Sequence, residues 1–548
     1  MRAFARLYGY VRYFHPSDEA AAIDWKAFAV HGAGRVKAAQ NPRALRDALD
    51  ELFAPIAPTA QILLLGDKKR DSAALAPGDT SGLVVVAWQH LGHGVNSSNV
   101  YRSARTNRGS AGPFAEHPQP GEVTEADLGG GVRCIVPLAL WSDGDHTLGE
   151  SRAALEPLVE KLGRVDTADA TSEDVRLGAM VVAWNVLQHF YPYFDVVDRD
   201  WDAALTEGLA HALAARNAED LQDALQLLVV GLRDGHANAY NMEKRKDRGY
   251  PTWLLTFADG KLWVTASGSD ALERGDQLLR VDGQDALALY EHGVSRRSGS
   301  ERWKRAIALE NLGYGPDGSI AEIEVIRDGE VVRAHLPRGK DDRLKEYDRP
   351  DVHELDSGIW YVNLDRAGMD EIRPHLKEIA AAPGVIFDLR YYPNSNHEVL
   401  AHLVPRADKD RWMFIAKTIY PDRERIVGWE AYGWDIQPAE PHIGGKVVFI
   451  TTGRAISYAE SWMGYVEAYQ LGEIVGEATA GANGNVVPFE VPGGFKISWT
   501  GMKVLKHDGS QQHLIGILPT VPVERTVRGI REGRDEYLER ALELFESR

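Results

Sequence analysis

The sequence contains almost no cysteine and no long apolar run. Cys134 is the single cysteine among 548 residues, so neither an intrachain disulfide nor a zinc or iron–sulfur site built from several cysteines can form. No stretch of 18 apolar residues occurs, so we expect no membrane-spanning helix. The N-terminus also lacks the basic, apolar and small-residue pattern of a secretion signal, and Arg2 to Phe14 is instead predicted to form an amphipathic helix.

Basic residues are fewer than acidic ones. The chain has 62 Lys and Arg against 80 Asp and Glu, and the resulting formal charge of −18 repels nucleic acid and anionic lipid. Apolar residues make up 44% and charged residues 26%, which is typical of an ordinary globular protein. At roughly 100 to 200 residues per domain, the length allows about three to five domains.

The front of the chain contains an internal repeat with an offset of 176 residues. Asp24-Trp25 matches Asp200-Trp201, and the helically spaced leucines of residues 45–52 recur at 221–228. We therefore predict two copies of a small helical unit, at 1–57 and 165–240. The segment between them, 58–164, is rich in glycine and in short apolar runs, and it is predicted to be an inserted β-rich domain.

The second copy ends in a motif that the first lacks. Leu232-Arg-Asp-Gly-His236 follows its last helix, whereas Thr59 and Ala60 stand opposite Gly235 and His236 in the first copy. A histidine on a glycine turn after a helix is well placed to face a cleft.

The second half of the chain changes its pattern twice. Residues 241–340 are strand-like. The turn–strand–turn from Gly275 to Gly283 is similar to that of PDZ domains, which bind peptides by strand addition. A purely structural β unit fits this pattern equally well. Residues 341–548 alternate strand and helix, which predicts a mostly parallel sheet with ligands at the carboxyl ends of its strands.

Two of those strand ends carry candidate chemistry. Ser457 follows a buried strand and precedes a helix, so its hydroxyl is either a helix N-cap or a nucleophile whose oxyanion would lie on free backbone N–H groups. The turn that contains Asn394 follows the neighbouring strand and offers a second oxyanion donor.

These motifs together resemble the tail-specific, or C-terminal-processing, serine proteases and the core of tricorn protease. The matching segments, in the family's order, are Leu232–His236, Gly275–Gly283, Val385–Asn394, Ala455–Glu460, Val475–Glu477, Gly516–Pro519 and Gly533–Leu538. The resemblance covers the chain from about Ala179 onward and implies a multidomain α/β protein with a ClpP/crotonase-like catalytic core at 341–548 and a PDZ-like β unit at 241–340.

The resemblance also implies roles for individual residues. Ser457 would be the nucleophile, the Tyr458 N–H and a backbone N–H near Asn394 would form the oxyanion hole, and His236 would be the general base of the tricorn-like branch. Members with a serine–lysine dyad carry the lysine about 25 residues after the serine, where this chain has Ala482-Asn483, so the tricorn-like branch is the closer one.

The third catalytic residue is not determined by the resemblance. The tricorn-like branch uses a late acidic residue, but the matching stretch here, Ser510 to Gly516, contains His513 instead. His513, Asp234 and Glu477 are the candidate supports, and an ordinary structural role is an open alternative for each.

The sequence therefore predicts a serine peptidase that acts on peptides or proteins, with a non-catalytic small-molecule or peptide carrier on the same fold as the alternative. Zinc-protease spacings, a Walker loop and a Rossmann fingerprint do not occur, so we predict no metal and no other cofactor. Monomer and homo-oligomer are both compatible with the sequence. By analogy with exported relatives, a periplasmic or secreted location is favoured.

Overall fold

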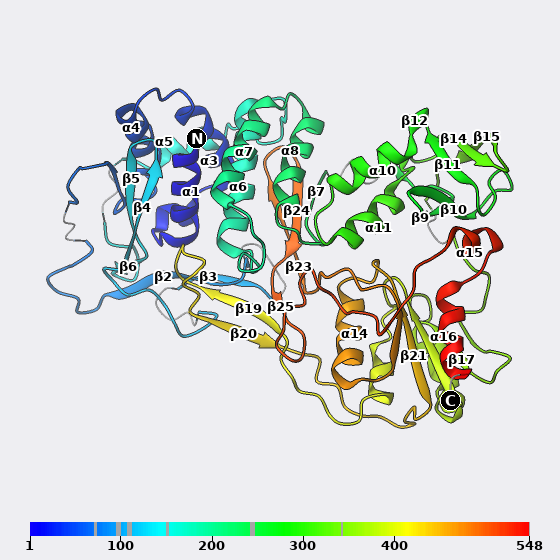
Figure 1. The fold of residues 1–548 in the computed structure, drawn as a ribbon. Helices are drawn as coiled ribbons and strands as arrows, with labels where there is room; N and C mark the ends of the chain where they lie inside the picture. Colours follow the sequence, from blue (N-terminus) through cyan, green and yellow to red (C-terminus); the bar gives the residue numbers. More distant parts are fainter. Residues whose placement is uncertain are drawn as a thin grey trace.

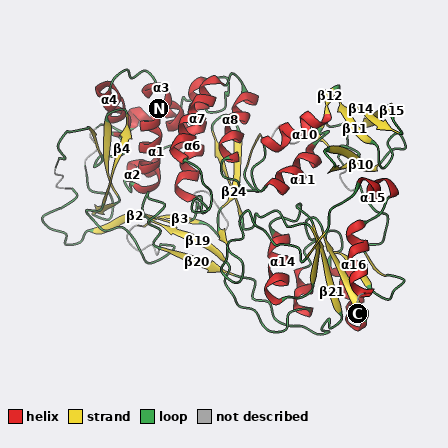
Figure 2. Cartoon of the chain, in the orientation of Figure 1, coloured by secondary structure: helices red, strands yellow, loops and turns green. Residues whose placement is uncertain are grey.

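The computed structural model describes residues 1–70, 74–94, 100–106, 112–149, 153–241, 247–340 and 344–546. Figure 1 shows the N-terminal helices at one end, a smaller unit of helices and strands at the other, and the C-terminal sheet below both. The same division into helical, mixed and sheet regions is visible in Figure 2.

The two N-terminal repeats fold into the same three helices. In the first copy these are α1 (Arg2–Phe14), α3 (Trp25–Val36) and α4 (Pro42–Phe53), and in the second α6 (Glu173–Phe190), α7 (Trp201–Ala214) and α8 (Ala218–Val230). Matching residues cap matching helices, because Asp24 and Asp200, then Asn41 and Asn217, each accept a backbone N–H of the helix that follows. Two short helices, α2 (Asp18–Ala22) and α5 (Glu156–Leu162), complete this region. Of the helices within the described ranges, none is both long and apolar enough to cross a bilayer.

The segment between the repeats shares its core with its neighbours. Its strands β1 (Gln61–Leu64), β5 (Val132–Pro137) and β4 (Val123–Gly129) form one antiparallel sheet. Its strands β2 (Val84–Leu91), β3 (Arg102–Thr106) and β6 (Ala139–Ser142) join β19 (Met413–Thr418), β20 (Gly428–Tyr432) and β25 (Lys503–Val504) from the C-terminal half. Many buried residues of 58–164, among them Ile62, Leu91 and Cys134, belong to the hydrophobic cluster that also contains residues of α1 and α6. The segment therefore shares sheets and hydrophobic core with the rest of the protein. Its limits as a domain stay a prediction.

The C-terminal core is the mostly parallel sheet that the β–α alternation predicts. Its strand order is β16 (Val352–Glu354), β17 (Trp360–Asn363), β18 (Gly384–Leu389), β21 (Lys446–Thr451), β22 (Glu473–Gly476) and β26 (Val521–Pro522). All neighbours pair in parallel except β16 with β17. The helices of this region are α12 (Met369–Ile372), η1 (Arg373–His375), α13 (Leu376–Ala381), η2 (His397–His402), α14 (Tyr458–Tyr469), α15 (Val527–Glu532) and α16 (Glu536–Glu546).

The unit at 241–340 has a hydrophobic cluster of its own, which includes Trp253, Leu278 and Leu336. Its sheet runs β15 (Glu330–Pro337), β14 (Ile320–Arg327), β11 (Gln277–Val281), β10 (Lys261–Ser267) and β9 (Trp253–Ala258), with β12 (Gln284–Asp285) beside β11. Helices α10 (Ala286–Ser295) and α11 (Glu301–Asn311) and the small pair β8 (Arg248–Gly249) and β13 (Gly315–Pro316) complete it. We call it the PDZ-like unit, an assignment that stays a prediction.

A further three-stranded sheet joins the second helical copy to the C-terminal half. Strand β24 (Phe495–Thr500) lies between β23 (Val486–Val491) and β7 (Asn238–Asn241), and β7 begins two residues after His236. This pairing brings the end of the second repeat to the C-terminal half.

The N-terminal region buries four histidines. His15 is hydrogen-bonded to the hydroxyls of Ser17 and Thr59, whereas neither ring nitrogen of His93 or His189 has a hydrogen-bond partner in the described part of the chain. Burial lowers the pKa of His15, His93 and His189 to about 3 and that of His90 to about 4. All four are therefore neutral in the folded protein at neutral pH.

These histidines predict a loss of stability in mild acid. As pH falls from about 7.5 to about 5, the unfolded chain takes up protons on these side chains and the folded chain does not, so the free energy of unfolding decreases. Urea unfolding at both pH values measures the decrease. It should be smaller in His93→Phe, while His292→Gln, on the exposed surface of α10, serves as the control for replacing a histidine. An equal decrease in wild type and His93→Phe would contradict the prediction.

Candidate active site

Ser457 occupies a strained turn between β21 and α14. Its backbone φ is 60° and its ψ −113°, a combination that side-chain-bearing residues rarely adopt. Its N–H donates to the Ala482 carbonyl at 2.9 Å, and its side chain makes no capping hydrogen bond to α14. The Ser457 hydroxyl is therefore not a helix cap. Sharp strand-to-helix turns of this kind present nucleophilic serines in hydrolases.

A buried carboxylate holds this turn in place. Glu460 is fully buried and accepts hydrogen bonds from the Thr479 hydroxyl at 2.5 Å and from the N–H groups of Gly481 and Ala482, both at 2.7 Å. Burial raises the pKa of Glu460, and the donated hydrogen bonds oppose that rise. Glu460 thus positions Ala482, whose carbonyl receives the Ser457 N–H. The sequence motif contained Glu460, but its part in holding the turn was missed.

The two predicted oxyanion donors differ in the structure. Among the described residues the Tyr458 N–H has no hydrogen-bond partner, so it is free to meet an oxyanion. The Asn394 N–H donates to the Leu364 carbonyl at 2.8 Å, and its side-chain amide donates to the Arg366 carbonyl at 2.7 Å. Asn394 is therefore corrected as a donor, because the closure of its own turn uses its hydrogen-bonding groups. In the same turn, the Tyr392 N–H is without a partner in the described part of the chain.

The turn that carries His236 packs against the turn that carries Ser457. A Cβ placed on Gly235 would lie 2.9 Å from the Ala482 side chain and 3.1 Å from that of Ile456, so the close approach requires glycine. The indole N–H of Trp303 donates to the Gly235 carbonyl at 3.0 Å. Within the described chain, no hydrogen bond joins His236 to the Ser457 hydroxyl. Such pairs are often loose in ligand-free sites and tighten when substrate binds.

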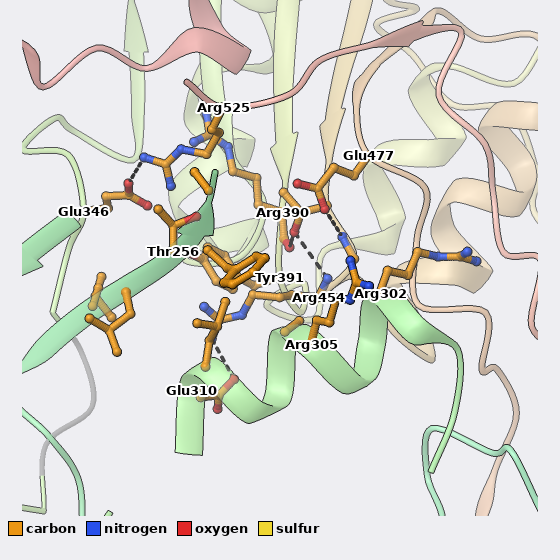
Figure 3. Close-up of a pocket in the computed structure, with 18 of the residues that line it drawn as sticks. Thr256, Arg302, Arg305, Glu310, Glu346, Arg390, Tyr391, Arg454, Glu477 and Arg525 are labelled. Carbon is orange, nitrogen blue, oxygen red and sulfur yellow. Dashed lines mark hydrogen bonds and ion pairs between the residues drawn. The ribbon is translucent and has the colours of Figure 1, made fainter. Parts of the chain in front are cut away.

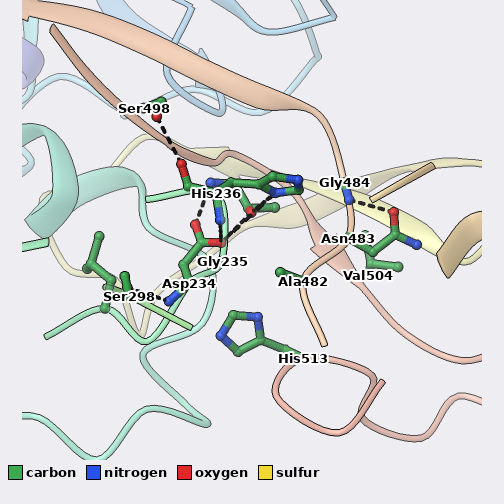
Figure 4. A network of polar contacts seen from close by, with 12 residues as sticks. Asp234, Gly235, His236, Ser298, Ala482, Asn483, Gly484, Ser498, Val504 and His513 are labelled. Carbon is green, nitrogen blue, oxygen red and sulfur yellow. Dashed lines mark hydrogen bonds and ion pairs between the residues drawn. The ribbon is translucent and has the colours of Figure 1, made fainter. Parts of the chain in front are cut away.

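His236 belongs to a buried polar network (Figure 4). Its Nδ1 lies 2.8 Å from Thr500 Oγ1, which lies 2.8 Å from the buried Asp234 carboxylate. Asp234 also accepts the backbone N–H groups of His236 at 3.0 Å and of Thr500 at 2.6 Å. Burial lowers the pKa of His236 below its ordinary value of 6.5, and the charge of Asp234 opposes this. Thr500 was not among the residues predicted from the sequence.

The other two candidate supports have different surroundings. His513 stacks on Tyr193, with ring centroids 3.9 Å apart, and its Nε2 lies 3.5 Å from the Tyr191 hydroxyl; burial lowers its pKa to about 4. Glu477 accepts the Tyr537 hydroxyl at 2.6 Å and the Gly453 N–H at 3.2 Å, at the carboxyl end of β22. Of the three candidates, only Asp234 is hydrogen-bonded into the network around His236.

A cavity of about 820 Å³ lies between the PDZ-like unit and the carboxyl ends of β18, β21 and β22 (Figure 3), and neither Ser457 nor His236 is among the residues that line it. Strand β9 and helix α11 form its wall on the side of the PDZ-like unit. Within the described sheet β9 pairs only with β10, so its other edge is free to pair with an extended segment. Arg454 lies over the ring of Tyr391 and is ion-paired with Glu310 at 2.7 Å on the opposite wall.

Helix α11 ties the PDZ-like unit to the catalytic turns. The Ser300 hydroxyl, just before the helix, donates to the Ala480 carbonyl at 2.6 Å. The Arg302 guanidinium donates to the carbonyls of Thr479, Leu514 and Ile515. The wall of the cavity and the turn behind Ser457 are therefore one connected structure. In the described part of the chain, no group of three His, Cys, Asp or Glu side chains is arranged to hold a metal ion, and the absence of a cofactor stays a prediction.

The role of Glu460 predicts a large effect on stability. Glu460→Ala would leave three buried donors unpaired, at a cost of about 1–3 kcal/mol each, so we expect a loss of about 3 kcal/mol or more in urea unfolding. Glu467→Ala is the control, because Glu467 lies on the same helix and forms one partly buried ion pair with Lys506, so its loss leaves fewer buried donors unpaired than the loss of Glu460. Equal losses in the two variants would contradict the assignment.

Comparison with known proteins gives one family. Residues 358–523 match the family model described as peptidase family S41. Mature CPAF complexed with lactacystin aligns with a TM-score of 0.54 at 14% identity, over 68% of this chain and 97% of CPAF, and mature CPAF alone gives 0.54 at 14%, over 68% and 96%. The photosystem II D1 C-terminal processing protease aligns with a TM-score of 0.41 at 15% identity, over 67% of this chain and 99% of its own. No curated protein sequence matches the chain. The likeness to CPAF shows a shared fold.

Proposed function

We propose that this serine peptidase, which belongs to the tail-specific serine protease family through its peptidase family S41 domain, hydrolyses peptide bonds through an acyl-enzyme on Ser457 with His236 as general base. One observation carries the proposal. The strained turn that frees the Ser457 hydroxyl packs directly against the glycine turn that holds His236. A carrier on the same fold, the alternative left open by the sequence, has no need of a strained serine beside a buried histidine.

The chemistry assigned to these groups balances in two steps. Ser457 Oγ attacks the peptide carbonyl carbon while its proton passes to His236 Nε2, and the protonated imidazole then gives that proton to the leaving amine as the C–N bond breaks. Water next attacks the acyl carbon while His236 takes its proton, and His236 then gives that proton to Ser457 Oγ as the Oγ–C bond breaks and the acid product leaves.

The oxyanion of each tetrahedral intermediate would lie on the free N–H groups of Tyr458 and Tyr392. The Tyr458 N–H stands at the N-terminus of α14, where the helix dipole also favours negative charge. One such donor is typically worth roughly 10²–10³ in rate. Because Asn394 anchors the turn through Leu364 and Arg366, its part in the proposal is to position Tyr392.

The substrate is a peptide or protein, and we propose that it reaches Ser457 as an extended segment paired with the free edge of β9. The cavity beside β9 is large enough for several residues in extended form. Strand pairing recognises the backbone of an extended segment rather than its side chains. This binding mode therefore fits a substrate segment in an unfolded region or at a chain terminus. A periplasmic or secreted location and the oligomeric state remain predictions from the sequence.

The nucleophile and base are tested with a fluorophosphonate probe and with fluorescein-labelled unfolded casein. Ser457→Ala should lose both labelling and hydrolysis, and His236→Ala should slow both by about 10²–10⁴, the usual contribution of a general base. The exposed Ser357→Ala and His292→Ala are the matched controls and should behave as wild type. If labelling and hydrolysis persist unchanged in Ser457→Ala and His236→Ala, the catalytic assignment is wrong and the carrier function is favoured.

The state of His236 predicts the acid side of the pH profile. His236 must be neutral to accept the Ser457 proton, and burial lowers its pKa, so activity should be retained below pH 6.5 and fall only at more acidic values. The rate of probe labelling measured against pH checks this. An acid limb centred above 6.5 would show that His236 is not the base that titrates.

A further inference from the structure

We propose that Thr500 and Asp234 are positioning residues that hold His236 with its proton on Nδ1, so that Nε2 keeps the lone pair needed to activate Ser457. The inference rests on the proposed function, because it concerns the base of that reaction. It selects Asp234 from the three candidate supports and adds Thr500, which the sequence did not indicate, as a hydroxyl between the carboxylate and the imidazole.

Asp234 and His236 have no direct hydrogen bond between their side chains. Asp234 Oδ1 lies 4.0 Å from His236 Nδ1, which is too far for a hydrogen bond. Thr500 Oγ1 lies between them, at 2.8 Å from each. A hydrogen-bonded connection from the carboxylate to the imidazole therefore runs through the threonine hydroxyl.

The number of protons on Asp234, Thr500 and His236 determines which group donates in each hydrogen bond of this relay. Both oxygens of the Asp234 carboxylate already face backbone N–H groups, from His236 and Thr500, so the carboxylate is an acceptor. The Thr500 hydroxyl has a single proton, and it donates this proton in a hydrogen bond to Asp234. Its oxygen can then approach Nδ1 at 2.8 Å only by accepting a hydrogen, because the opposite orientation would set two lone pairs against each other on the Asp234 side. A neutral imidazole carries one N–H, so that hydrogen is on Nδ1 and Nε2 is the free base.

The same hydrogen-bonded relay stabilises the His236 imidazolium that forms during the reaction. When His236 takes the Ser457 proton, the imidazolium donates from Nδ1 to a hydroxyl that is polarised by a buried carboxylate. His513, which lies in the stretch that matches the one carrying the late acid of the tricorn-like branch, has no hydrogen bond to His236 within the described residues and stacks on Tyr193 instead. Asp234 is the carboxylate that the fold connects to the base.

The relay depends on strand pairing between distant parts of the chain. Thr500 is the last residue of β24, which pairs with β7 so that Ser498 stands opposite Asn238. The Ser498 hydroxyl also donates to the His236 carbonyl at 2.9 Å. This register sets Thr500 beside the imidazole, and a shift by one residue would turn its side chain to the other face of the sheet.

The test replaces the hydroxyl without changing the shape of the side chain. Thr500→Val keeps both branches at Cβ but breaks the relay, and Thr500→Ser keeps the hydroxyl. We expect the maximal rate of fluorophosphonate labelling to fall about 10-fold to 10²-fold in Thr500→Val, with little change in the probe concentration for half-maximal rate, and to stay within about threefold of wild type in Thr500→Ser. Thr418→Val, a buried strand threonine of β19, controls for the loss of a buried hydroxyl.

A second measurement does not depend on activity. Nitrogen chemical shifts of isotope-labelled histidine in the full chain distinguish the two tautomers, and the His236 signal is assigned by its absence in His236→Gln. At about one pH unit above the ordinary histidine pKa, wild type and Thr500→Ser should carry the proton on Nδ1, whereas Thr500→Val should shift towards the Nε2 form.

The outcomes separate this inference from the proposed function. If Ser457→Ala and His236→Ala abolish labelling but folded Thr500→Val labels like wild type and keeps the Nδ1 tautomer, the relay is wrong and the catalytic assignment stands. Equal slowing of Thr500→Val and Thr500→Ser would also overturn it, because the loss would then follow from packing. If His236→Ala labels like wild type, the catalytic assignment fails, while the tautomer measurement still reports on the relay.

Discussion

The positive φ of Ser457 depends on the hydrogen bonds that the buried Glu460 makes behind it. A side-chain-bearing residue in such a backbone conformation costs about 1–3 kcal/mol, and Glu460 accepts three hydrogen bonds from the turn whose Ala482 carbonyl holds the Ser457 N–H. Hydrogen bonds to a charged group contribute about 1.5–3 kcal/mol each. The turn can therefore stay strained while the Ser457 hydroxyl makes no capping hydrogen bond to its own helix.

The groups around this turn come from separate parts of the protein, and the connections between those parts are polar and specific. His236 arrives from the second helical repeat, and Gly235 allows it to approach Ile456 and Ala482. Helix α11 of the PDZ-like unit binds the same turn through Ser300 and Arg302. A movement of the PDZ-like unit would thus act on the backbone that supports Ser457, because one set of hydrogen bonds serves both.

Much of this architecture could be predicted from local sequence. The repeat of Asp24-Trp25 and Asp200-Trp201 predicts matching helices, because caps and helical periodicity act over a few residues. Buried strands followed by helices predicted the parallel sheet and placed Ser457 at the carboxyl end of a strand. The donor role of Asn394 was wrong, because whether an N–H faces the site or its own turn depends on how that turn closes on Leu364.

The sequence by itself predicted a serine peptidase with Ser457 as the candidate nucleophile, because several short motifs in one order resemble those of a known family, and one of them also predicts the strand, the turn and the helix around Ser457. Which of the candidate supports is hydrogen-bonded into the network around His236 was decided only by the tertiary structure. Asp234, His513 and Glu477 were equal candidates in the sequence, and Thr500 was not a candidate at all. Thr500 lies 264 residues from His236, and the pairing of β24 with β7 brings them together. The physical reason is that strand register between distant segments is set by packing of the whole sheet, which no local pattern encodes.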